Sequence, residues 1–124
     1  MQFMNRVWLQ GRISSQPSLR DLTHRTRITS FSLDVVESWT NDRLEDKSRT
    51  NRVPVEVVGK DAERVAHEAR LGRWVTLEGY IRTEQSKGET VLKVRTLSIA
   101  VWEELHDRSR LQARAQGEPA PEVP

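Results

Sequence analysis

Residues 53–82 constrain the fold of this chain most, because their hydrophobic period changes twice within one short stretch. Valines at 53, 55 and 57 alternate with other residues, as in a half-buried strand. The apolar positions then take the i, i+3, i+4, i+7 spacing of a helix, at Ala62, Val65, Ala66 and Ala69. The period of two returns at Val75, Leu77, Gly79 and Ile81. The stretch therefore predicts a strand, a helix and a second strand. Asp61 is placed to cap the start of the helix, and Gly72 to end it.

Three more strands are predicted outside this stretch. Residues 6–13 put Val7, Leu9 and Ile13 on one face, and residues 29–35 alternate in the same way. Residues 90–101 are rich in β-branched side chains, but their apolar register changes in the middle, which predicts a bulge near Arg95 or Thr96.

The remaining segments are predicted to be connections. Residues 14–27 contain Pro17 and several hydroxyl side chains, and we expect a connection that begins the next strand near its end. Residues 37–51 are almost entirely polar, which predicts a long flexible hairpin loop. Residues 83–89 predict a second hairpin loop.

Five strands with one short helix between the third and fourth give the element order of the OB-fold, a partly open five-stranded all-β barrel. A β-sandwich is the alternative, but the single helix in that slot favours the barrel. We expect one domain over residues 1–102. Residues 103–124 are expected to form a charged, partly helical and then proline-rich disordered tail.

Composition excludes several classes of function. The chain has 124 residues, no cysteine and a net charge of +2, so neither disulfides nor thiolate metal sites are expected. No apolar run approaches a membrane span, and a cytoplasmic protein without membrane contact is predicted. His24, His67 and His106 lack the spacing of metal ligands. We expect no metal, no cofactor and no enzymatic activity.

Basic and aromatic residues gather on the predicted strand faces that point away from the core. They are Arg6, Trp8, Arg12, Arg52, Trp74, Tyr80, Arg82, Lys93 and Arg95, with Lys87 in the second hairpin loop. Lysine and arginine bind phosphates, and aromatic rings stack on unpaired bases, so this composition is typical of a single-strand binder. Trp8, Trp74 and Tyr80 are also compatible with a subunit interface or with the cap of an open barrel end. Trp39 lies in the long polar segment with no obvious core to fill, which favours a binding role.

The chain resembles the bacterial single-strand DNA-binding proteins and their relatives, the primosomal replication protein N group. The matching pieces are Asn5-Arg6-Val7, Gly11-Arg12, Phe31-Ser32-Leu33, Glu37-Ser38-Trp39, Gly59-Lys60 and residues 75–83. The resemblance implies an OB-fold, a homo-oligomer (dimer or tetramer) and sequence-tolerant binding of single-stranded DNA in replication, repair or recombination. It also implies a nucleoid-associated location and contacts with other replication or primosome proteins.

The departures from the family pattern leave alternatives open. Aromatic residues of the main branch that stack on bases fall here on Trp39, Arg52, Val58 and Ser86, and only Trp39 is aromatic. The acidic tail with an aromatic tip, through which main-branch members recruit partners, has no counterpart in Pro-Ala-Pro-Glu-Val-Pro. A dimeric primosomal accessory factor for replication restart, an OB-fold interaction module without DNA binding, and an RNA ligand are the competing interpretations.

Overall fold

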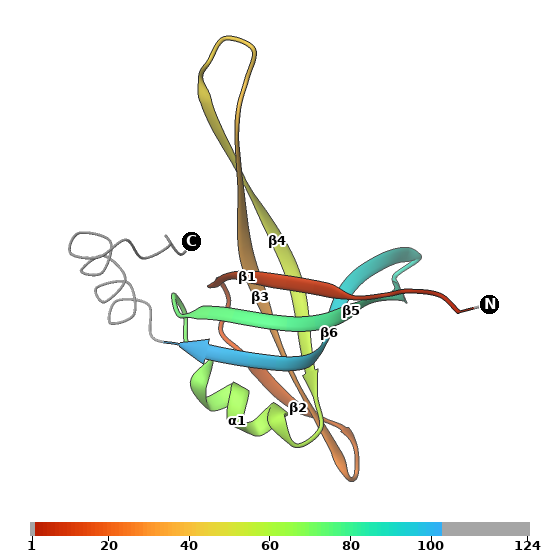
Figure 1. The fold of residues 1–124 in the computed structure, drawn as a ribbon. Coiled ribbons are helices and arrows are strands. Elements are labelled where there is room, and N and C mark those ends of the chain that lie inside the picture. The colour runs from red at the N-terminus through yellow and green to blue at the C-terminus, as the bar shows by residue number, and fades with distance from the viewer. Residues whose placement is uncertain (1, 103–124) are drawn as a thin grey trace.

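A computed structural model of the chain describes residues 2–102, which form one barrel with a long hairpin rising from it (Figure 1). The elements in chain order are β1 (Val7–Ile13), β2 (Ser18–Thr23), β3 (Thr26–Thr40), β4 (Asp46–Val58), α1 (Asp61–Glu68), β5 (Trp74–Ser86) and β6 (Glu89–Trp102). The prediction of a tail over residues 103–124 lies outside the described residues.

Five of the strands close into a barrel. The sheet runs β1-β5-β6-β4-β3-β2, and a further pairing of β1 with β3 closes the barrel and leaves β2 outside it. Barrel neighbours are antiparallel except β4 and β6, which pair in parallel through Val55 with Val94 and Glu56 with Arg95. The helix lies between β4 and β5, the third and fourth barrel strands. This confirms the predicted five-stranded OB-fold with its helix in the expected slot.

The core is built from the strand faces that the period of two predicts. Val55, Val57, Val75 and Leu77 are buried in one cluster with Leu33, which is fully buried. Beyond the barrel, Ile81 continues the same face but is 41% exposed, because the strand runs out past the end of the core.

Two glycines allow the barrel strands to approach each other. A Cβ atom at Gly11 would lie 2.3 Å from the carbonyl oxygen of Asp34, and one at Gly79 would lie 2.4 Å from that of Arg95. Gly11 is in β1 close to the residues that pair with β3, and Gly79 faces β6 beside the bulge. Both positions therefore exclude a side chain for reasons that hydrophobic periodicity does not reveal.

The helix forms where its period predicts, and its buried residues are Ala62 and Val65. The predicted capping role of Asp61 is wrong. Lys60 occupies the N-cap with no side-chain hydrogen bond, and Asp61 is the first helical residue, where its acidic side chain suits the helix dipole. The buried hydroxyl of Thr29 in β3 instead anchors the helix by donating to the carbonyl of Ala62.

The long hairpin corrects the predicted flexible loop over residues 37–51. Strands β3 and β4 remain paired from Ile28 with Val58 to Thr40 with Asp46, so only five residues form the tip. Ladder hydrogen bonds need no apolar side chain, which is why a polar sequence still forms strands here. The alternating hydrophobic pattern ends where β3 and β4 extend beyond the core.

Three smaller differences concern connections. The predicted connection at 14–27 contains β2, an edge strand with mostly exposed side chains that, among residues 2–102, pairs only with β3. The second hairpin loop is reduced to Lys87 and Gly88, whose φ angles of 51° and 82° suit a tight two-residue turn. The predicted bulge is confirmed one position along, at Leu97, where the partners of Glu78 and Gly79 are Ser98 and Thr96.

Candidate nucleic-acid interface

A row of outward-facing side chains crosses the barrel from β5 to β2. The pairing places Tyr80 beside Arg95, Arg95 beside Glu56, and Glu56 beside Ser30, whose partner on β2 is Ser18. In the next row Arg82 pairs with Lys93. The predicted residues Tyr80, Arg82, Lys93 and Arg95 thus come together on the hairpin of β5 and β6, and the pairing of β6 with β4 brings Glu56, from a distant part of the sequence, beside them.

A buried carboxylate lies at the centre of this face. Glu56 is only 2% exposed. One of its oxygens accepts hydrogen bonds from Nε and Nη2 of Arg95 at 3.2 and 3.1 Å, and the other accepts from Nζ of Lys93 at 3.1 Å. Lys93 also donates to Glu84 at 2.8 Å. Two cations and two carboxylates therefore form a cluster with no net charge.

The pKa values of two cluster members reflect these contacts. The hydrogen bond to Glu84 raises the pKa of Lys93 against the opposing effect of burial, with Glu56 adding to the rise. The same bond lowers the pKa of Glu84. Both groups are therefore held in their charged forms.

Arg52 lies further along β4 and is held by its neighbour on β3. Its Nε and Nη2 donate to the two carboxylate oxygens of Asp34 at 2.9 and 3.2 Å. These hydrogen bonds lower the pKa of Asp34, against partial burial, and raise that of Arg52. The Arg52 side chain is 65% exposed, so solvent and ligands reach it.

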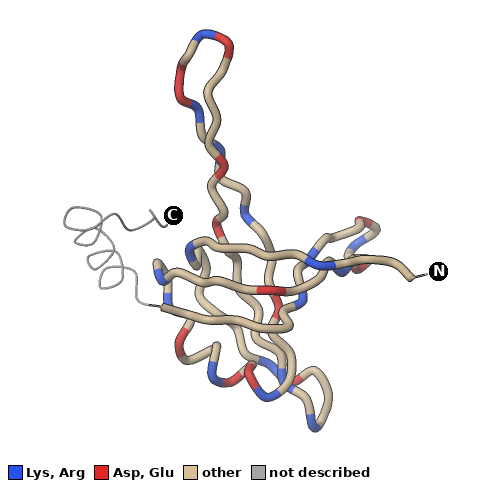
Figure 2. The backbone as a smooth tube through the Cα atoms, viewed as in Figure 1, with Lys and Arg blue, Asp and Glu red and all other residues tan. Residues whose placement is uncertain are grey.

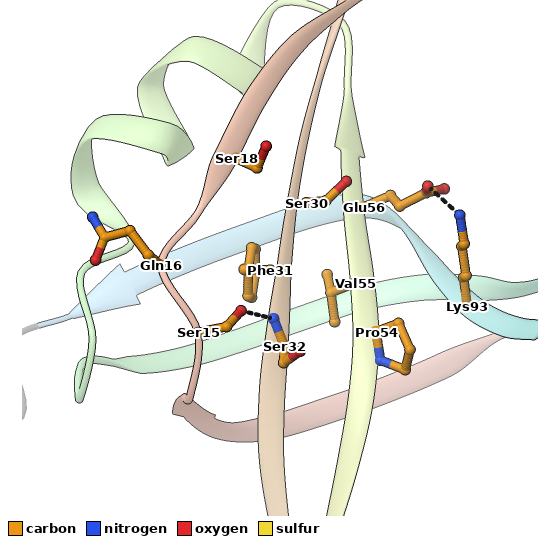
Figure 3. A pocket seen from close by; sticks show the side chains of 10 residues that line it. All are labelled: Ser15, Gln16, Ser18, Ser30, Phe31, Ser32, Pro54, Val55, Glu56 and Lys93. Atoms are coloured by element: carbon orange, nitrogen blue, oxygen red, sulfur yellow. Dashed lines mark hydrogen bonds and ion pairs between the residues drawn. The ribbon is translucent and has the colours of Figure 1, made fainter.

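A groove of about 290 Å³ opens beside the charge cluster (Figure 3). Its polar lining comes from Ser15, Gln16, Ser18, Ser30, Ser32, Glu56 and Lys93, and its apolar lining from Phe31, Pro54 and Val55. The hydroxyl of Ser15 accepts from the backbone N–H of Ser32 at 2.8 Å, which joins the segment after β1 to β3. Glu56 and Lys93, joined by their ion pair, flank the groove on the β4 side.

The long hairpin carries Trp39 far from the barrel. Trp39 is 47% exposed and pairs with Lys47 on β4. A shallow pocket of about 410 Å³ is lined by both residues and by Ser38, Thr40, Asp46 and Ser48. Acidic and basic residues alternate along the hairpin (Figure 2), as the sequence indicated, so its field is weak and Trp39 is its most distinctive group.

A second group of predicted residues lies further along the outer side of the barrel, on β1 and on the part of β5 and β6 away from their hairpin turn. The rings of Trp74 and Trp102 stack with centroids 5.6 Å apart, and the guanidinium of Arg12 lies 5.5 Å from the Trp74 ring centroid. Arg6 forms an ion pair with Glu78 at 3.4 Å, and neighbouring Trp8 is 69% exposed.

Predicted residues thus fall into separate sets. Tyr80, Arg82, Lys93 and Arg95 lie on the part of β5 and β6 next to their hairpin turn. Trp8, Arg12 and Trp74 lie on β1 and the other part of β5, on the same outer side of the barrel, with Arg6 just before β1. Arg52, Trp39 and Lys87 lie along the two hairpins. Sequence reasoning missed Glu56, the groove serines and Trp102. An acid between two valines of a predicted strand was the available signal for Glu56, but its cationic partners lie on a strand whose register the sequence did not give.

Other kinds of site find no support in the described chain. Within residues 2–102 no group of three His, Asp or Glu side chains is arranged to hold a metal ion. The described part of the chain also contains no helix long and apolar enough to cross a membrane.

The whole barrel matches one family model. Residues 4–107 match the single-strand binding protein family. The chain belongs to this family. Among curated relatives, it is 35% identical over 81 residues to a single-stranded DNA-binding protein of Clostridium tetani, covering 64% of this chain and 54% of the relative. It is 30% identical over 101 residues to single-stranded DNA-binding protein 2 of Listeria innocua, covering 79% of this chain and 62% of the relative. The chain thus spans little more than half of the length of these relatives.

Solved structures of this family share the fold. The Plasmodium falciparum SSB complex with ssDNA superposes with a TM-score of 0.75 at 20% identity, over 83% of this chain and 98% of that one. A deletion mutant of the single-stranded DNA binding protein from Thermus aquaticus gives a TM-score of 0.74 at 20% identity, over 82% of this chain and 52% of that one. The barrel and its helix are therefore the family fold.

Proposed function

We propose that this chain binds single-stranded DNA with little regard to sequence and acts where single strands are exposed in replication, repair or recombination. The observation that carries the proposal is the shared outer face of β3, β4, β5 and β6, where Tyr80, Arg82 and a polar groove lie together on a barrel of this family. In OB-folds this side of the barrel binds oligonucleotides. Such a ligand would place the protein at the nucleoid.

The proposed contacts divide by chemistry. Trp39 and Tyr80 offer rings on which bases stack, a contact of about 1–3 kcal/mol per base. Arg82 and Lys87 are exposed and form no ion pair with a carboxylate in residues 2–102, so they are the best placed to neutralise phosphates. Arg52 can join them by leaving Asp34. Lys93 and Arg95 are already neutralised by Glu56 and Glu84, and we assign them no phosphate.

We also propose that the chain forms a homo-oligomer, a dimer or a tetramer, through β1 and the face beside it. Among residues 2–102, the second edge of β1 pairs with β3 only at Arg12 and Ile13, which leaves the start of the strand available to another chain. Trp8 projects from that part of β1. On this interpretation Trp8, Arg12 and Trp74 serve assembly rather than DNA.

Titration of the protein with oligo(dT) at low and moderate salt tests the function, and a mass measurement in solution tests the assembly. We expect binding that weakens steeply as salt increases, because each neutralised phosphate releases counterions. No binding at either salt concentration, or binding indifferent to salt, would refute the proposal and favour an interaction module. Matched RNA oligomers in the same titration decide the nucleic-acid class.

Trp39→Ala tests the hairpin separately. We expect weaker binding with unchanged thermal stability, because the ring lies on an exposed hairpin outside the core. Leu44→Ala is the matched control, since Leu44 is 85% exposed at the tip of the same hairpin and has no flat ring for a base. Equal affinities of the two variants would remove Trp39 from the site.

A further inference from the structure

We propose that the groove over β3 and β4 seats one nucleobase of the bound strand, and not a phosphate, through a set of donors and acceptors that accepts any base. This inference rests on the proposed function and concerns how the chain binds when Arg52, Val58 and Ser86 stand where the resemblance to the family implies stacking aromatic residues.

The charges around the groove favour a base over a phosphate. Glu56 lies in the groove lining, and a phosphate placed there would meet its carboxylate, which is ion-paired with Lys93 and Arg95. Lys93 and Arg95 cannot offset that repulsion fully, because the carboxylates of Glu56 and Glu84 already neutralise these two cations. A neutral base edge meets no such penalty.

The lining suits a base edge of any identity. The Gln16 amide both donates and accepts and Lys93 supplies donors, while the hydroxyls of Ser30 and Ser32 rotate to donate or accept. Every base carries at least one donor and one acceptor on its hydrogen-bonding edges, so each finds partners here. A groove with fixed donors alone would select among bases, whereas this one tolerates them all.

Size and shape limit the occupant to one base. The groove of about 290 Å³ is close to the lower end of the roughly 300–1,000 Å³ typical of small-ligand pockets. The Pro54 ring supplies exposed apolar surface at its edge, beside the buried Phe31 and Val55. Tyr80 lies in the same row of the sheet as Glu56, so a neighbouring base can stack there while the first enters the groove.

Two substitutions of Ser30 test the groove. Ser30→Leu fills it, and Ser30→Ala removes the hydroxyl while leaving the space. The probes are oligo(dT), oligo(dC), oligo(dA) and an oligomer whose sugars carry no base. We expect Ser30→Leu to weaken binding of all three base-bearing oligomers about five- to tenfold. Ser30→Ala should weaken it about two- to threefold, the size of one weak hydrogen bond. Binding of the abasic oligomer and the salt dependence should not change.

Glu56→Gln separates a base from a phosphate by the sign of its effect. If the groove seats a base, affinity falls or stays level and the salt dependence is unchanged. If it is a phosphate site masked by Glu56, affinity rises and the slope of log K against log salt steepens by about 0.7 for each cation released. The second result overturns the inference. Thermal unfolding checks that each variant folds, and if Ser30→Leu does not, Ser30→Ala and Glu56→Gln decide.

The titrations distinguish a failure of the groove proposal from a failure of the proposed DNA binding. Salt-dependent binding by the wild type with no loss in Ser30→Leu overturns the groove and leaves the proposed function standing. Absence of binding by the wild type removes both.

Discussion

Releasing Arg52 from Asp34 should strengthen the dependence of binding on salt. Asp34→Asn keeps the shape of the side chain but removes the charge that holds both guanidinium nitrogens, at 2.9 and 3.2 Å. Arg52 is exposed and lies on the strand that continues from the groove into the long hairpin, so a phosphate of the bound strand can take the place of the carboxylate. We expect tighter binding of oligo(dT) at low salt.

The size of the effect follows from one additional phosphate contact. Each contact adds about 0.7 to the slope of log K against log salt for a single strand. Between 50 and 200 mM salt, a fourfold change, the variant should therefore lose roughly 2.6-fold more affinity than the wild type. Stability should change little, because the pair is exposed on its arginine side and surface ion pairs contribute little to folding.

Fluorescence anisotropy over a salt series, with labelled oligo(dT), measures the slope directly. The double variant Asp34→Asn with Arg52→Gln is the control, and its slope should fall back to the wild-type value or below. An unchanged slope in Asp34→Asn would refute the reasoning, as would a gain that survives the loss of Arg52. Either result would mean that the bound DNA does not contact this part of β4.

Three further predictions concern folding. Gly79→Ala should lower the free energy of unfolding by about 1–3 kcal/mol, because its Cβ would lie 2.4 Å from the carbonyl oxygen of Arg95 and the strands must separate. Leu33→Ala should lower it by about 2–5 kcal/mol, since Leu33 is fully buried in the barrel core. Both are measured by denaturant unfolding. Lys93, whose pKa is raised above its ordinary 10.5, should contribute stability that is present below pH 10.5 and lost as pH rises through the higher folded value. Unfolding free energies between pH 9 and pH 12 check this, and Glu84→Gln should flatten the profile.

Each of these three folding predictions would be contradicted by a specific result. Wild-type stability in Gly79→Ala would mean that the strands at the bulge have room for a methyl group. A loss below 1 kcal/mol in Leu33→Ala would mean that the barrel collapses readily around a smaller side chain. An alkaline profile identical in wild type and Glu84→Gln would show that the ion pair of Lys93 does not contribute to folding.

The sequence predicted best where residues face a continuous core. One side of each strand is buried, so apolar residues such as Val55, Val57, Val75 and Leu77 alternate with other residues along it. The sequence pattern therefore shows which side faces the core. It predicted poorly where backbone hydrogen bonds alone define the strand. Residues 37–51 form most of the long hairpin without an apolar face, and β2 is an exposed edge strand. The sequences of both segments therefore show no alternating hydrophobic pattern.

Candidate site residues divide in the same way. Periodicity correctly placed Arg6, Trp8, Tyr80 and Arg82 on faces away from the core, because side chains alternate along a strand. It did not say which strands lie side by side. Their order and register decide that Tyr80 lies beside Arg95 and Arg95 beside Glu56, while Trp8 lies beside Glu78, further along β5.

The sequence by itself determined the five core-facing strands, the helix between the third and fourth, and the outward position of the basic and aromatic residues, since each depends on local spacing. Only the tertiary structure decided how those residues combine. Closure of the barrel brought Glu56 between Lys93 and Arg95, and so turned two predicted phosphate ligands into a neutral cluster beside a groove. The sequence shows which side chains are charged. Whether such a charge is available to bind a phosphate depends on neighbouring side chains, which only the fold determines.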